Sequence, residues 1–373
     1  MSDKSNDERI NWVYCPRCGY KLSEGSPDIA ECPSCGLNFQ LLGSNAQVKE
    51  MLPNTSQKKE KIKLKEEEII NNPKAFWRPK ASIFWPLISL IIMSQILGVI
   101  LIILVFAGVA SFESLLSPGF IIVSSIAELV FMVVPVLYVG QYLQNPSFKN
   151  RAKFLGVFIR KEERFFTLKE SLLGIGFAVV CVFIVNLLSL VLEIIFNPVL
   201  PTNVPTDEID VMFSSSNLIE TILLSIIMIV IIGPSEEIAF RGFMQRGLVR
   251  SYNKKKGIWI TAIIFALIHV VTVLVDIPNS PISTIVYFFV LFAPYLLISL
   301  ILGYLFSWRN ENLIAPILTH GVYNAITVIL AFLAYRFSNI ILWLFFIAIG
   351  VVSLLCFLIY YYLEKSYIRE IEN

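Results

Sequence analysis

The chain has 373 residues, of which 56% are hydrophobic, and its formal net charge at pH 7 is +2. Its mean hydropathy of +0.72 excludes an ordinary soluble globular fold, in which the apolar share is smaller. We therefore expect an all-α polytopic protein whose main environment is the lipid bilayer. The almost balanced charge gives no reason to expect a nucleic acid as a partner.

The first 45 residues contain two Cys-Pro-x-Cys-Gly motifs, which supply Cys15, Cys18, Cys32 and Cys35. Four thiolates on two tight turns suit the tetrahedral coordination of zinc, so residues 1–45 are predicted to form a zinc ribbon with one structural zinc ion. A pair of disulfides or a redox motif is the alternative. No signal peptide is recognisable in the first eighty residues, which argues against the oxidising compartment that disulfides need.

Residues 46–80 have the composition of a charged linker, and a long apolar region follows at 81–365. A helix needs roughly 20 apolar residues to cross about 30 Å of hydrocarbon. About eight stretches meet this requirement, at 83–110, 119–143, 171–196, 218–248, 258–275, 283–307, 313–334 and 340–363. Trp77 precedes the first stretch and Trp85 lies at its beginning, and we expect both at the membrane interface.

Basic residues alternate between the loops that join these stretches. Lysines and arginines are frequent before the first stretch and in the loop at 149–169, whereas the loop at 197–217 has none. The positive-inside rule then predicts that both termini are cytoplasmic, which agrees with an even number of crossings. We expect the protein to be integral to the plasma membrane.

Two glutamates and an arginine interrupt the fourth apolar stretch, at Glu236, Glu237 and Arg241. Charged groups are costly inside a bilayer, so this cluster indicates a functional site. Gly233 and Pro234 come just before it, and proline favours a kink at which the helix restarts, with the glutamates near the positive end. Glu237 and Arg241 are four residues apart and are predicted to pair, which leaves Glu236 as the free carboxylate.

The chain has two histidines, His269 in the fifth stretch and His320 in the seventh. Phe265 lies one helical turn before the first histidine, and Asn324 lies one turn after the second. The rise per residue places Glu236 and both histidines roughly 12–18 Å from the basic edge of their spans. Each motif alone could be a structural contact between helices, but their shared depth favours one functional site.

The motifs Glu-Glu-x3-Arg, Phe-x3-His and His-x3-Asn, in this order on separate spans, resemble the signature of the CPBP family. These are the CAAX-protease and bacteriocin-processing intramembrane proteases, and the resemblance covers the core at about 218–334. It implies an α-helical endopeptidase, of a family long classed as metalloproteases, that acts on membrane-associated and in some members prenylated proteins. The implied catalytic residues are Glu236, Glu237, Arg241, His269, His320 and Asn324.

For peptide hydrolysis, we expect Glu236 to be the base that activates water, with help from His269. His320 and Asn324 would donate to the oxyanion, and the Glu–Arg pair would orient these groups. A catalytic divalent metal held by the two histidines and a glutamate is an alternative that the sequence leaves open. A non-catalytic scaffold or immunity-type protein also stays open, as does, with less support, a transporter with a proton site at the midplane.

A fragment of residues 1–45 tests the predicted ribbon. Structural zinc supplies folding free energy to a module too small for a core of its own, so the fragment should lose its structure on chelation. Circular dichroism with and without EDTA, together with elemental analysis for zinc, makes the measurement. A purified fragment without metal, or one with a Cys15–Cys18 disulfide under cytosolic conditions, would contradict the prediction.

Overall fold

The structure is a computed structural model that describes residues 77–108, 122, 124–143, 145–160, 163, 165–197, 217–276 and 281–372. All regular elements in these ranges are helical. The four cysteines of the predicted ribbon and residues 46–76 of the linker lie outside the described residues, as does most of the 197–217 loop. The prediction of an all-helical chain is therefore confirmed for the part that the structure describes.

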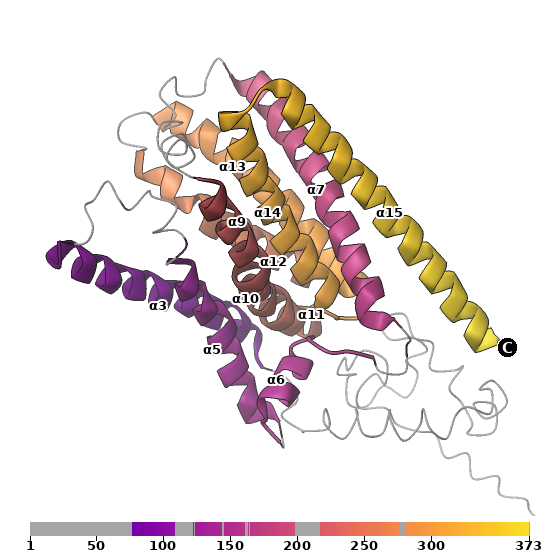
Figure 1. Ribbon diagram of the computed structural model, residues 1–373. Helices are drawn as coiled ribbons and strands as arrows, with labels where there is room; N and C mark the ends of the chain where they lie inside the picture. Colours follow the sequence, from indigo (N-terminus) through magenta and orange to yellow (C-terminus); the bar gives the residue numbers. More distant parts are fainter. Residues whose placement is uncertain are drawn as a thin grey trace, which may run out of the picture.

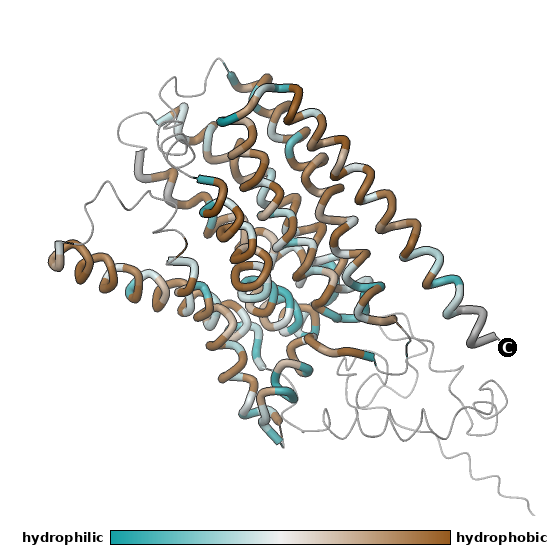
Figure 2. The backbone as a smooth tube through the Cα atoms, in the orientation of Figure 1, coloured by the Kyte–Doolittle hydropathy of each residue, from teal (hydrophilic) through white to brown (hydrophobic). Residues whose placement is uncertain are grey.

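Seven helical segments in the described ranges are long and apolar enough to cross a membrane. They are Pro79–Phe106 (α3), Ser125–Tyr142 (η3, α5 and η4), Phe166–Phe196 (α7), Leu218–Ser251 (α9 to α11), Pro281–Trp308 (α13), Ile314–Arg336 (α14) and Asn339–Tyr367, the greater part of α15 (Asn339–Glu372). Figure 1 shows α7, α13, α14 and α15 side by side, while α3 diverges from them. The tube in Figure 2 is apolar over most of these helices, as contact with lipid requires.

The predicted fifth span, 258–275, is shorter than expected. Its helix α12 covers Lys254–Val270, and the 3-10 helix η7 (Val271–Asp276) follows. The 17 residues of α12 extend over about 25 Å, which is less than the hydrocarbon thickness of about 30 Å. Hydropathy does not mark this end because apolar residues continue into η7. We therefore count seven spanning segments in the described residues instead of eight, with α12 packed against α13.

The fourth span does not break at Gly233 and Pro234, contrary to the prediction from sequence. It runs through α9 (Leu218–Ile227), η5 (Met228–Ile232), α10 (Gly233–Glu237), η6 (Ile238–Gln245) and α11 (Arg246–Ser251), where η5 and η6 are π-helical. Ile232 and Ile238 keep right-handed helical angles at the two junctions. The wider π-helical turn before Pro234 accommodates a residue that lacks a backbone N–H. The glutamates thus lie inside one continuous helix.

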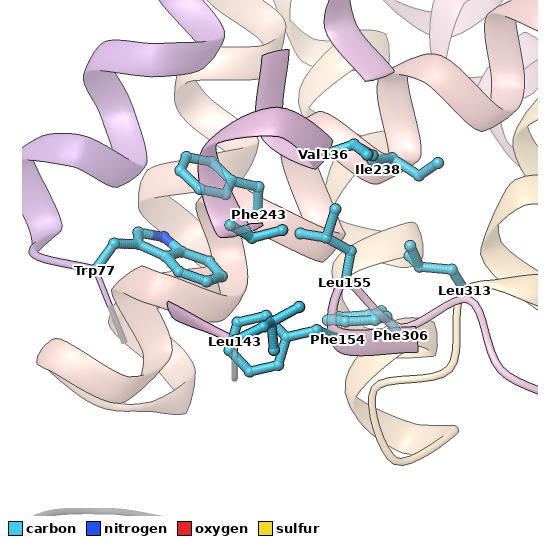
Figure 3. Packing of buried hydrophobic residues seen from close by; sticks show 10 residues of the cluster. Trp77, Val136, Leu143, Phe154, Leu155, Ile238, Phe243, Phe306 and Leu313 are labelled. Carbon is cyan, nitrogen blue, oxygen red and sulfur yellow. The ribbon is translucent and has the colours of Figure 1, made fainter. Parts of the chain in front are cut away.

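A cluster of buried apolar side chains joins the beginning of α3 to the fourth span (Figure 3). Trp77 stacks on Phe243 of η6, with ring centroids 4.4 Å apart. Phe154, the last residue of α6 (Phe148–Phe154), contacts the same indole edge to face. Trp77 is only 2% exposed, so it belongs to the core and not to the membrane interface where we expected it.

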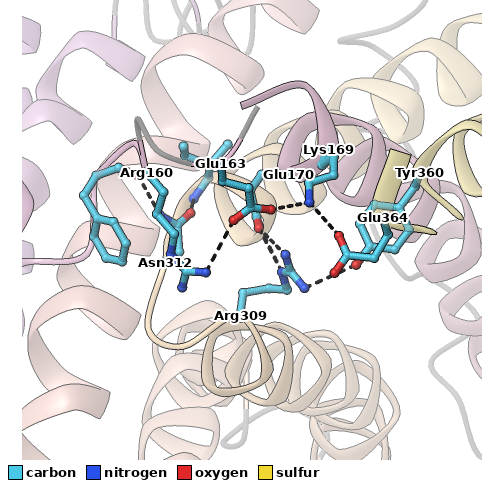
Figure 4. Close-up of polar contacts among 10 residues, drawn as sticks. Arg160, Glu163, Lys169, Glu170, Arg309, Asn312, Tyr360 and Glu364 are labelled. Carbon is cyan, nitrogen blue, oxygen red and sulfur yellow. Dashed lines mark hydrogen bonds and ion pairs between the residues drawn. The ribbon is translucent and has the colours of Figure 1, made fainter. Parts of the chain in front are cut away.

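Ion pairs fasten one end of the bundle (Figure 4). Arg309, just after α13, donates to the Glu170 carboxylate of α7 at 2.9 Å. Lys169 of α7 contacts Glu163, which lies just before α7, and it also contacts Glu364 of α15. Nearby, burial would raise the pKa of the Glu311 carboxyl, but the guanidinium groups of Arg246 and Arg250 outweigh it and lower this pKa to about 2. Charged pairs therefore hold α7, α13 and α15 together where the polar residues gather.

Two glycines allow the backbone of α14 to come into direct contact with the backbone of the fourth span. A Cβ atom on Gly321 would lie 2.8 Å from the Cα atom of Ile229, and one on Gly233 would lie 2.9 Å from the Cα atom of Gly321. Small residues permit such close packing in membranes, where helix association depends on van der Waals contact. Since His320 precedes Gly321, the contact also brings this histidine to the glutamates of α10.

Gly321→Ala tests the importance of this contact. The added methyl group would meet backbone atoms of Met228 and Ile229, so we expect a destabilisation of about 1–3 kcal/mol and a lower melting temperature in detergent. Gly350→Ala in α15 is the matched control, because nothing lies within 4 Å of a Cβ atom there. The control should keep or slightly raise the melting temperature, since alanine favours helices. Equal melting temperatures for both variants would show that the glycine contact is not needed.

Candidate functional site

Three helices bring polar side chains to one point in the apolar bundle. Glu236 belongs to α10, His269 to α12 and His320 to α14. The Oε2 atom of Glu236 lies 3.9 Å from Nε2 of His269 and 3.7 Å from Nε2 of His320. These separations are too long for direct hydrogen bonds and suit a small bridging molecule such as water. The side chains expected at one depth are therefore neighbours.

Glu237 is the centre of a fully buried network. Its Oε1 atom accepts hydrogen bonds from Nη1 of Arg241 at 2.7 Å and from Nδ1 of His320 at 2.8 Å. Arg241 also donates from Nη2 to the Ser299 hydroxyl at 2.8 Å, and its guanidinium lies 4.6 Å from the ring centre of Phe265. The carboxylate, the hydroxyl and the ring together stabilise a cation that has no access to solvent. The predicted pairing of Glu237 with Arg241 is confirmed.

The hydrogen bonds determine which nitrogen of each histidine faces Glu236. An ionised carboxylate and a backbone carbonyl can only accept, so Nδ1 of His320 donates to Glu237. For the same reason Nδ1 of His269 donates to the backbone oxygen of Phe265, at 2.7 Å. In neutral rings, the Nε2 atoms are then acceptors. Both face the Oε2 atom of Glu236, which is buried and has no hydrogen-bond partner among the described residues.

This donor set has the chemistry of a His2Glu zinc site, in which each histidine also gives its second N–H to a protein acceptor. The separations of 3.9 and 3.7 Å from Glu236 to the two histidines are longer than the about 3.4 Å between ligand atoms that lie about 2.0–2.1 Å from a tetrahedral zinc ion. The ranges that the structure describes contain no group of three or more His, Cys, Asp or Glu placed to hold a metal ion. We therefore derive no chemical step through a metal.

Asn324 lies one turn after His320 on α14 and is half-buried. Its carboxamide forms no hydrogen bond with any other residue in the described ranges. It therefore lies outside the network around Glu237. Its N–H groups are free to meet a ligand.

The sequence analysis did not predict several residues that lie at the site. Tyr295 of α13 stacks on His269, with ring centroids 4.8 Å apart, and Ser299 accepts from Arg241. A single tyrosine or serine in an apolar helix is too common to indicate a site. Glu128 in the second apolar stretch was also missed, although it lies in η3, which packs against η5, and its Oε2 atom is buried without a hydrogen-bond partner in the described ranges. An ionisable side chain inside an apolar span was the signal that could have revealed it.

The fold and the buried cluster define the class, an integral membrane protein with a polar site inside its helical bundle. Within it, residues 218–326 match the family model described as type II CAAX prenyl endopeptidase Rce1-like, a family of proteases. The matched stretch contains all six predicted site residues, from Glu236 to Asn324. Comparisons with curated proteins and with solved structures found no match.

Glu237→Gln tests whether the buried ion pair supports the fold as well as the site. The change leaves Arg241 without a negative partner, and breaking a buried pair costs about 3–5 kcal/mol. The melting temperature in detergent should fall clearly. Glu193→Gln is the matched control, because Glu193 is an exposed acid of α7 outside the network. If Glu237→Gln melted at the same temperature as this control, the pair would have no structural role.

Proposed function

We propose that the chain is an intramembrane endopeptidase that hydrolyses peptide bonds of membrane-associated proteins. The observation that carries the proposal is the buried Oε2 atom of Glu236, which has no partner among the described residues and faces acceptor nitrogens from two helices. Three acceptors around one point need a donor between them, and water is the donor that hydrolysis consumes. The match of residues 218–326 to a prenyl endopeptidase model supports the same chemistry.

In this proposal, water donates one hydrogen bond to Glu236 and another to Nε2 of His269 or His320. Glu236 takes a proton as the water oxygen bonds to the carbonyl carbon of the substrate, and such base catalysis contributes about 10²–10⁴-fold. Glu236 is only 7% exposed, so few other waters compete for its carboxylate. The neighbouring Glu237 holds Nδ1 of His320 and thereby keeps the acceptor side of the ring toward the water.

Asn324 is the proposed donor to the oxyanion that forms on the carbonyl oxygen. A neutral amide in a half-buried position can stabilise a developing negative charge, and one such donor contributes about 3 kcal/mol. His320 was expected to share this role. Because its Nδ1 atom already donates to Glu237, we assign it to the water instead.

Prenylated C-terminal peptides are the proposed substrate class, on the strength of the matched family model. A prenyl chain partitions into the bilayer and would bring the adjacent peptide bond to a site within the spans. The plasma membrane remains part of the proposal. Two cytoplasmic termini also remain part of it, and they require α12 to cross together with η7 as an eighth segment beside the seven spans. The zinc ribbon likewise remains a prediction, and its residues lie outside the described ranges.

Glu236→Gln tests the proposed mechanism in vesicles, with a fluorogenic peptide that ends in a prenylated Cys-aliphatic-aliphatic-X sequence. The variant keeps the shape of the side chain but removes the base, so kcat/KM should fall at least about a hundredfold. Its melting temperature should stay close to that of the wild type, because Glu236 forms no hydrogen bond that the change would break. Glu193→Gln should cleave at the wild-type rate. Full activity of Glu236→Gln would refute the mechanism.

A further inference from the structure

We propose that Tyr295 of α13 is a positioning residue, whose ring holds the imidazole of His269 so that its Nε2 atom stays turned toward Glu236. The inference rests on the proposed function, in which this nitrogen accepts a hydrogen bond from the attacking water. An acceptor must keep its direction during the reaction, since a small misplacement of a catalytic group costs much of the rate. Tyr295 takes no part in the chemistry and acts through His269.

The two histidines of the site differ in how firmly their neighbours hold them. His320 is 6% exposed, and its Nδ1 atom donates to the Glu237 carboxylate, which Arg241 holds in turn. His269 is 26% exposed, and its Nδ1 atom donates to the backbone oxygen of Phe265 in its own helix. Hydrogen bonds to a charged group are the stronger kind, so His269 has the weaker anchor. Its hydrogen bond also fixes one ring atom and leaves the plane of the ring free to tilt.

Two aromatic rings fix the plane of this imidazole. The Phe265 ring lies 4.4 Å from the His269 ring between centroids, at an interplanar angle of 34°, and the Tyr295 ring lies at 4.8 Å and 25°. Two rings on the same face of an imidazole would touch each other, but Phe265 and Tyr295 share no ring contact in the described ranges. The imidazole therefore lies between them. Stacking on both faces opposes rotation of the ring.

The geometry of α13 brings Tyr295 to this position. Helix α12 packs along α13, and Tyr295 lies one turn before Ser299, so both side chains point to the same side of the helix. Ser299 accepts from Arg241, whose guanidinium covers Phe265. One face of α13 thus supports the two consecutive turns of α12 that carry Phe265 and His269.

Core packing does not account for this tyrosine. Tyr295 is 37% exposed, and among the described residues its ring contacts one other ring, that of His269. Its hydroxyl forms no hydrogen bond with another residue in these ranges. The ring therefore supplies the effect, and we expect phenylalanine to replace tyrosine at this position.

Solid-state nitrogen NMR of histidine-labelled protein tests the holding of His269 without any substrate. The chain has two histidines, so the full protein in phosphatidylcholine vesicles gives two imidazole spectra, and His269→Gln assigns them. In the wild type, both rings should have a protonated Nδ1 and an unprotonated Nε2 atom. In Tyr295→Leu, the His269 signals should broaden and average over both tautomers, while those of His320 stay unchanged. Tyr295→Phe should keep the wild-type spectrum.

Cleavage of the fluorogenic prenylated peptide tests the effect on the reaction. Tyr295→Leu keeps apolar bulk but removes the flat ring, so kcat should fall about tenfold. The KM should stay within about twofold, because the ring acts on His269 and not on the substrate. Tyr295→Phe should keep kcat within about twofold of the wild type.

Tyr304→Leu is the matched control for both measurements. Tyr304 is an exposed tyrosine of the same helix that makes no ring contact in the part of the chain that the structure describes. This variant should keep the wild-type spectrum and cleave at the wild-type rate. It also gives the melting temperature expected for the loss of an exposed tyrosine from α13.

The outcomes separate this inference from the proposed function. An unchanged His269 spectrum in Tyr295→Leu would overturn the positioning role, and so would equal losses of kcat in the leucine and phenylalanine variants. A melting temperature of Tyr295→Leu well below that of Tyr304→Leu would mark the residue as structural and overturn it as well. A wild type that cleaves nothing would overturn the proposed function, and the spectra alone would then decide whether Tyr295 holds His269.

Discussion

An arginine without access to solvent must keep a carboxylate beside it, and the arrangement of the site depends on this pair. Arg241 and Glu237 are both fully buried, so loss of either partner would leave an uncompensated charge in an apolar interior. The oxygen of Glu237 that neutralises Arg241 also accepts the Nδ1 proton of His320. The guanidinium covers Phe265, whose backbone oxygen accepts from His269. The ion pair thereby orients His320 toward Glu236, while the backbone of α12 orients His269.

The backbone of the fourth span adapts to this network. The π-helical turns η5 and η6 flank the short helix α10, which carries both glutamates. Such turns occur often at functional sites, since they change the direction of side chains without ending the helix. The contact between Gly233 and Gly321 then brings α14 to backbone distance. Local helix geometry and one glycine contact thus bring His320 to the glutamates of α10, although these residues are far apart in sequence.

The sequence predicted those features that depend on local pattern. Hydropathy predicted the helical spans, and the cost of buried charge identified Glu236, Glu237 and Arg241. Features that depend on packing between helices were missed. Pro234 predicts a break, yet π-helical turns keep the span continuous, and Trp77 is buried because Phe243 stacks on it. Tyr295 joins the site only through its stacking on His269, so no motif includes it.

The most direct test of the account is the structure of the inactive Glu236→Gln protein with a bound prenylated peptide, determined by electron cryomicroscopy in lipid nanodiscs. If the buried cluster is a hydrolytic centre, the scissile carbonyl carbon should lie within about 4 Å of the position for water beside residue 236. Its oxygen should face Asn324. A peptide held with its scissile bond away from both histidines would contradict the account and favour a protein that binds partners without cleaving them.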